Sequence, residues 1–207
     1  IDAAEDDGVA TFAAIDAVET LTFGPGSTDP HFFTDPTQVA TAAQAIADFL
    51  ADEVPALDAD ELRTQTTAYV DELAALDAEM EATLASIPAD RRKLVTNHEV
   101  FGYFAQRYDF EVIGAVIPTG TTQAAPSAAE LAGLARTIEQ AGVPAIFAET
   151  SSPTRLADAL AGEVGEVGEV QVVELFTESL GPEGSAGDTY AGMMRSDAER
   201  IADALSG

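Results

Sequence analysis

The fold is decided by residues 93–117, which read KLVTNHEVFGYFAQRYDFEVIGAVI. We predict an apolar strand over residues 93–96 and a second one over 112–117, with a short helix over 99–107 between them. A strand, a helix and a strand in this order are typical of parallel neighbours in one sheet. The pattern continues to the end of the chain, with strands expected over 143–148 and 170–175 and helices over 127–140, 153–161 and 189–205. These β–α units predict an α/β lobe built on a four-stranded, parallel, doubly wound sheet.

The chain upstream of this lobe is predicted to be mainly helical. Asp35 and Pro36 form a helix-start signal. A capping pattern at residues 58–61 then opens the longest apolar periodicity in the chain, which Pro88 stops. A helix over 58–87 would be roughly 44 Å long, which is long enough to join two lobes.

On this pattern, residues 1–57 cannot fold alone. A single strand is predicted over 9–15, and its two edges would have no neighbour. We therefore expect part of a first lobe to lie upstream of Ile1. The resulting division of the chain is a remnant of the first lobe over 1–57, a linker helix over 58–87 and a second α/β lobe over 88–207.

The composition excludes several classes of function. Among 207 residues, 37 are Asp or Glu and 9 are Lys or Arg, which gives a formal charge of −28. Such a chain repels phosphate groups and lacks a basic patch, so we expect neither nucleic-acid binding nor attraction to an anionic membrane surface. The chain has no cysteine for a disulfide or a thiolate site, and no apolar run reaches the ~20 residues of a membrane span, so this segment is not expected to insert. An acidic surface with a single lysine favours a salt-adapted, halophilic source.

Two histidines and two acids stand at positions that suit a binding site. His98 and Glu149 follow predicted strands, and ligands of open α/β sheets bind at the carboxyl ends of strands. His31 ends a loop that contains proline, and Asp188 precedes the last helix. Imidazole and carboxylate groups together suit a divalent transition metal, so His31, His98 and Asp188 are candidate ligands. Asp188 has an alternative role as a helix cap, and each histidine could be an ordinary structural residue.

Other chemistries lack a motif in this sequence. Neither a nucleophile elbow nor a phosphate-binding loop is present. The repeat of glycine, glutamate and valine over 162–170 is interpreted as a loop, whose carboxylates could hold a cation weakly.

Four segments, in order along the chain, resemble the motifs of one family. Residues 29–36, DPHFFTDP, are similar to DPHxWxDP, and residues 97–104, NHEVFGYF, are similar to HxxFGYF. Residues 146–149, IFAE, resemble the F-x-E that ends a strand, and residues 187–194, GDTYAGMM, resemble GD[ST]YxxMM. Together these segments resemble the TroA-like solute-binding proteins, which serve zinc and manganese ABC importers. The resemblance covers essentially the whole chain.

This resemblance implies a periplasmic-binding-protein-like clamp of two lobes, joined by one long helix, with a metal ion between the lobes. His31 would be the ligand from the first lobe, and His98 and Asp188 would be the ligands from the second. A further first-lobe ligand would lie upstream of Ile1. Glu149 would orient a ligand or a bound water. Zn²⁺ is expected first, because a histidine at position 98 stands where manganese members often have glutamate, and Mn²⁺ second.

The function implied is that of a receptor outside the cytoplasmic membrane, at the cell surface or in a periplasm-like space. It would capture the metal ion as a monomer and deliver it to an ABC transporter permease, without being an enzyme. A segment upstream of Ile1 would anchor it to the membrane. Two alternatives stay open at this point: a metal-dependent hydrolase that uses the same three residues, and an adhesion or scaffold protein with a vestigial metal site.

Overall fold

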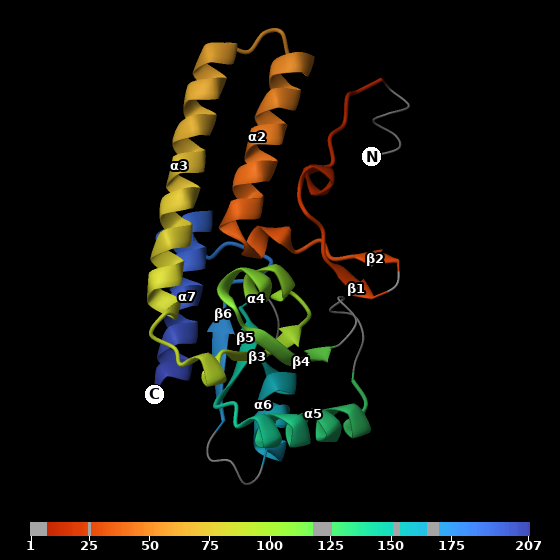
Figure 1. Ribbon diagram of the computed structural model, residues 1–207. Helices are drawn as coiled ribbons and strands as arrows, with labels where there is room; N and C mark the ends of the chain where they lie inside the picture. The colour runs from red at the N-terminus through yellow and green to blue at the C-terminus, as the bar shows by residue number, and fades with distance from the viewer. Residues whose placement is uncertain (1–7, 25, 118–125, 151–153, 165–169) are drawn as a thin grey trace.

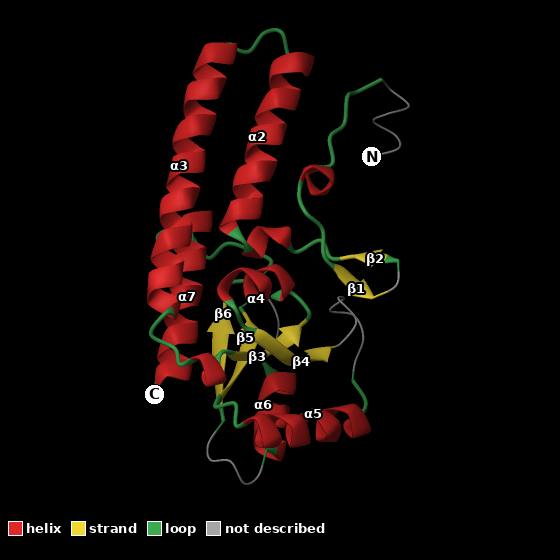
Figure 2. Cartoon of the chain, in the orientation of Figure 1, coloured by secondary structure: helices red, strands yellow, loops and turns green. Residues whose placement is uncertain are grey.

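A four-stranded parallel sheet is the centre of the second half of the chain (Figures 1 and 2). The computed structural model describes residues 8–24, 26–117, 126–150, 154–164 and 170–207. The strands lie in the order β4-β3-β5-β6 and comprise β3 (Lys93–His98), β4 (Glu111–Ile117), β5 (Ala145–Glu149) and β6 (Gln171–Leu175). The predicted α/β class and four-stranded parallel sheet are therefore confirmed. Because Glu149 pairs with Leu175 and His98 with Ile117, the carboxyl ends of all four strands meet at one edge.

Helices cover both faces of this sheet, as the apolar runs of its strands require. On one face, α5 (Ala128–Ala141) and α6 (Arg155–Glu163) enclose a core cluster that contains Ile146. On the other face, α4 (Gly102–Tyr108) and α7 (Tyr190–Ser206) enclose a second cluster that contains Phe147. Successive side chains of a strand point to opposite faces, so these two neighbours in β5 fill different cores. Both are almost fully buried.

Two long helices, α2 (Pro36–Glu53) and α3 (Ala59–Leu84), form an antiparallel pair that rises above the sheet (Figure 1). Their starts follow the sequence signals, because the Asp35 carboxylate accepts the Thr37 backbone N–H and the Asp58 carboxylate accepts those of the first turn of α3. The last turns of α3 enter the core of the α/β lobe beside α7, with their apolar side chains fully buried (Leu73, Leu76, Met80 and Leu84). One helix thus connects the α2 region to the sheet. The division into domains at residues 57 and 87 stays a prediction.

The structure corrects the prediction for the first thirty residues. The expected strand over 9–15 is wrong: among the described residues this stretch contains only the start of a 3-10 turn, η1 (Ala14–Ala17), and it has no strand beside it to complete a backbone ladder. Conversely, the loop that was expected before His31 contains a small antiparallel hairpin, β1 (Thr22–Gly24) and β2 (Ser27–Thr28).

Smaller differences concern the ends of elements. β3 and β5 each extend to the residue that was expected to follow them, so His98 and Glu149 are the last residues of their strands. α4 begins at Gly102 instead of residue 99. The repeat over 162–170 falls largely outside the described residues. None of the helices in the described part of the chain has the length and apolar character to cross a membrane.

Candidate metal centre

His31 lies in the segment between β2 and α2, immediately before the 3-10 turn η2 (Phe32–Thr34). The Asp29 side chain holds it, because Oδ1 accepts the His31 backbone N–H at 2.9 Å and lies 2.7 Å from Nδ1 of the ring. Since an ionised carboxylate can only accept, this contact assigns the ring hydrogen to Nδ1 and leaves a lone pair on Nε2. Both residues are buried. The ring is therefore fixed with its second nitrogen available to a ligand.

His98 is held in the same way from the other side of the site. It ends β3, its side chain is fully buried, and its Nδ1 makes a short contact with Oε1 of Glu149 at the end of β5. Asn97 Nδ2 donates to the same oxygen at 3.4 Å. Burial lowers the pKa of His98, but the hydrogen bond and charge of Glu149, together with Glu178, outweigh this effect, so the pKa is raised above 6.5.

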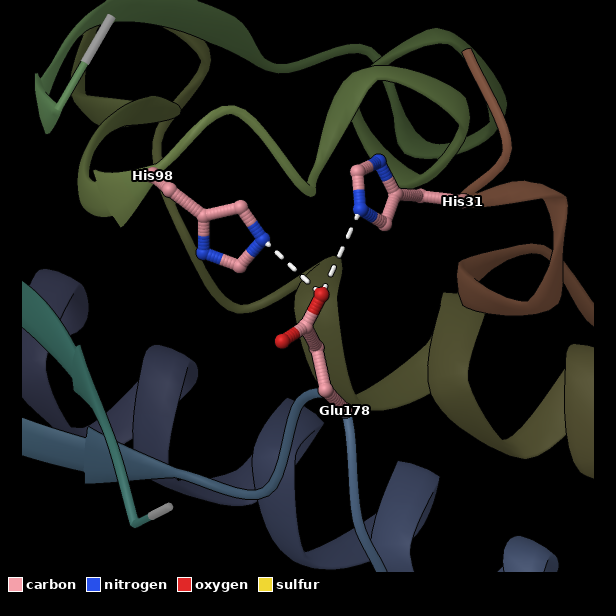
Figure 3. Close-up of side chains that lie close together, drawn as sticks. All are labelled: His31, His98 and Glu178. Carbon is pink, nitrogen blue, oxygen red and sulfur yellow. Dashed lines mark ion pairs between the residues drawn. The ribbon is translucent and has the colours of Figure 1, made fainter. Parts of the chain in front are cut away.

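A third side chain completes the group: Glu178, in the loop that follows β6. Its Oε1 lies 3.4 Å from Nε2 of His98 and 3.7 Å from Nε2 of His31. Figure 3 shows the carboxylate of Glu178 pointing toward the two rings. These three ligand atoms all lie within 4.8 Å of one another. Nε2 of His98 is buried and has no hydrogen-bond partner within the described part of the chain. A buried nitrogen without such a partner, beside a carboxylate and a second imidazole, is the arrangement that a metal ion would complete.

Of the predicted ligands, the structure brings His31 and His98 together but leaves Asp188 out of this group. The Asp188 carboxylate accepts the backbone N–H of Gly184 at 2.9 Å and so stabilises the loop before α7. The cap of α7 is Thr189, whose hydroxyl accepts the backbone N–H of Gly192. Asp188 stays a predicted ligand, and Glu178 is a further candidate that the structure brings beside the two histidines. The rule that ligands bind at the carboxyl ends of strands could have indicated Glu178, since it follows the fourth strand.

Carboxylates outnumber imidazoles in this region. Asp29, Glu149 and Glu178 contact the two rings, and Glu99 directly follows His98. Burial, and after it the charge of Asp29, raises the pKa of Glu99. With neutral imidazoles, the group of side chains around His31 and His98 has an excess of negative charge that a divalent cation would neutralise.

Comparison with known proteins identifies a family. Residues 2–204 match the family model described as the zinc-uptake complex component A, periplasmic. The chain belongs to this family. The resemblance predicted from the motifs is thereby confirmed.

Two relatives and one solved structure illustrate the similarity. The zinc-binding protein TroA of Treponema pallidum (strain Nichols) is 34% identical over 200 residues, which are 96% of this chain and 64% of that protein. The manganese ABC transporter substrate-binding lipoprotein PsaA of Streptococcus pneumoniae is 29% identical over 199 residues, with coverage of 94% and 62%. The structure of periplasmic TroA from Treponema pallidum matches with a TM-score of 0.88 and 30% identity, over 100% of this chain and 75% of that one. The chain thus spans less than two thirds of the length of these two curated relatives.

Proposed function

We propose that this chain is the metal-capturing part of a receptor outside the cytoplasmic membrane, which binds Zn²⁺ and delivers it to an ABC transporter permease. The observation that carries the proposal is the convergence of Nε2 of His31, Nε2 of His98 and Oε1 of Glu178 from three separate segments. The names of the relatives support the same function, since they are described as zinc-binding or metal ABC transporter substrate-binding proteins.

The donor set favours zinc over manganese. Two of the three candidate ligand atoms are imidazole nitrogens, which suit zinc, whereas manganese sites are built mainly from oxygen ligands. Mn²⁺ is therefore the second candidate. A donor from elsewhere, or water, would occupy the fourth position.

Capture would depend on charge at two length scales. The formal charge of −28 raises the concentration of cations near the whole surface. Within the site, Asp29 and Glu149 hold the Nδ1 atoms and so present neutral Nε2 lone pairs to the ion. Binding then exchanges water on the ion for ligand atoms that already lie close together.

A hydrolase with this ligand set is less well supported. It would need a general base beside a metal-bound water, and Glu149, which was expected to orient a ligand or a bound water, would have to supply it. In the structure, the Glu149 carboxylate is 2% exposed and is engaged by Nδ1 of His98, behind the ring and away from Nε2. The receptor function, in contrast, needs no general base. Non-enzymatic action, the monomeric state and an anchor upstream of Ile1 belong to the same proposal.

Equilibrium dialysis against equimolar Zn²⁺ and Mn²⁺, in high salt to suppress surface binding, tests the proposal. We expect about one equivalent of zinc in the unmodified chain by mass spectrometry, and its loss in His98→Ala and Glu178→Gln. Glu183→Gln is the matched control, because Glu183 is an exposed glutamate of the same loop.

Retention of the metal in Glu183→Gln and its loss in Glu178→Gln would support the assigned site. Equal, non-stoichiometric metal in all variants would contradict it, because the acidic surface would then account for all binding. This outcome would leave the scaffold alternative as the better description.

A further inference from the structure

The segment that carries His31 is fixed at two backbone carbonyls, one on each side of the histidine. The Tyr103 hydroxyl donates to the carbonyl of Asp29 at 2.8 Å, and the Tyr190 hydroxyl donates to the carbonyl of Phe33 at 2.8 Å. Asp29 and Phe33 flank His31 symmetrically along the chain. The Tyr103 hydroxyl also accepts the backbone N–H of Leu21 at 2.9 Å, so the residue that precedes β1 is held by the same side chain.

Both tyrosines come from the part of the molecule that supplies the other two ligands. Tyr103 is in α4, which follows His98, and Tyr190 is the first residue of α7, which follows the loop of Glu178. Each hydroxyl therefore links the His31 segment to a helix that follows another candidate ligand along the chain. These two links, together with the packing of Phe33 against the core, hold the His31 segment against the elements that follow the other two candidate ligands.

The chemistry of the two hydroxyls suits a permanent link. Burial raises the pKa of Tyr103 and of Tyr190 above that of free tyrosine, so both groups are protonated donors at neutral pH. The Tyr103 side chain is fully buried, and Tyr190 packs with Phe33 against the core. Water therefore competes poorly for either carbonyl.

We propose that Tyr103 and Tyr190 are positioning residues of the metal site, whose two hydroxyl–carbonyl bonds hold His31 against His98 and Glu178 and thereby set the rate at which a bound metal ion leaves. This inference rests on the proposed metal-binding function. Release of the ion requires His31 to separate from the other two ligands, and that separation stretches both bonds. A lost neutral hydrogen bond changes an equilibrium about 2- to 12-fold, so each Tyr→Phe variant is expected to release zinc about 3- to 10-fold faster.

The test measures zinc release from the zinc-loaded chain by stopped flow, with a chromogenic chelator in excess, for Tyr103→Phe, Tyr190→Phe and the double variant. Tyr108→Phe is the matched control, because its buried hydroxyl donates to Asp77 of α3 at 3.0 Å instead of to a backbone carbonyl beside His31. We expect faster release in both single variants, a further increase in the double variant and an unchanged rate in the control. Circular dichroism confirms that each variant is folded.

A second set of variants, made in His31→Ala, distinguishes a positioning role of the tyrosines from a general effect on stability. In His31→Ala, the residual zinc site no longer depends on the position of residue 31, so Tyr103→Phe should leave its release rate unchanged. Unaltered release in the tyrosine variants, equal acceleration in Tyr108→Phe, or acceleration that persists in His31→Ala would each overturn the proposal while the metal-binding function stands. Failure of the unmodified chain to bind zinc would instead overturn both.

Discussion

Replacing Asp197 with asparagine is expected to stabilise the protein at neutral and alkaline pH. Asp197 lies in α7, is 3% exposed, and accepts the backbone N–H of Phe176 at 2.9 Å, just before the loop that carries Glu178. Burial raises its pKa to about 7, although the hydrogen bond from Phe176 and the charge of Arg200 act in the opposite direction. Asparagine keeps the accepting oxygen and cannot ionise, so it removes the cost of a buried charge.

The magnitude follows from the two pKa values. They are 3.8 for an unperturbed carboxyl and about 7 in the fold, a difference of about 3 pH units, which at 1.36 kcal/mol per unit is about 4 kcal/mol. Between these values the folded chain holds a proton that the unfolded chain has lost, so this group lowers the free energy of unfolding as the pH rises from about 4 to about 7. Above pH 7 its effect is constant. Asp197→Asn should therefore match the unmodified chain near pH 4 and exceed it by about 4 kcal/mol at pH 8.

Urea unfolding in high salt at pH 5 and pH 8 measures this difference, since salt screens the other acidic groups. Asp203→Asn is the control, because Asp203 is an exposed acid of the same helix. A stability difference between Asp197→Asn and the unmodified chain that is the same at both pH values would refute the reasoning. So would a loss of stability in Asp197→Asn at pH 8.

Gly102→Ala should weaken zinc binding about 10-fold, because a Cβ at this position would lie 2.9 Å from Oδ2 of Asp29 and displace the carboxylate that orients His31. Zinc titration against a competing chelator measures the affinity, and an equal loss in Gly133→Ala, where a Cβ meets open space, would contradict this prediction. Zinc affinity should fall as the pH drops through a value above 6.5, because the raised pKa of His98 lets protons compete with the metal at a higher pH than they would at a free imidazole. An affinity that stays constant between pH 8 and pH 5 would exclude His98 as a ligand. Leu76→Ala should cost about 2–5 kcal/mol in urea unfolding, because this side chain of α3 is fully buried in the core; a cost below ~1 kcal/mol would show that the helix is not anchored there.

The starts of α2, α3 and α5 could be predicted from the sequence because their signals are local. The Asp58 side chain accepts the backbone N–H groups of Asp60 and Glu61, and Ser127 with Glu130 forms a complete capping box. Such contacts join residues two or three apart, which a sequence displays directly. The strand over 9–15 could not be judged in this way, because a strand exists only with a neighbour from elsewhere in the chain.

The site was predictable in part for a related reason. His31 and His98 stood out because the chain has 2 histidines, and His98 followed a predicted strand. Glu178 did not stand out, since it is one of 37 acids and follows its strand at a distance that no local rule fixes. Asp188 was favoured by its motif, but whether its carboxylate faces the histidines or its own loop depends on the path of residues 181–187. Only the three-dimensional structure shows that the backbone of Gly184 uses it.

The most direct test of the metal centre is an anomalous difference map at the zinc edge from crystals of the zinc-loaded chain. We expect one dominant peak, about 2.1 Å from Nε2 of His31, Nε2 of His98 and Oε1 of Glu178. A dominant peak beside Asp188, or several weak peaks on surface carboxylates without one between the histidines, would contradict the assignment of this site.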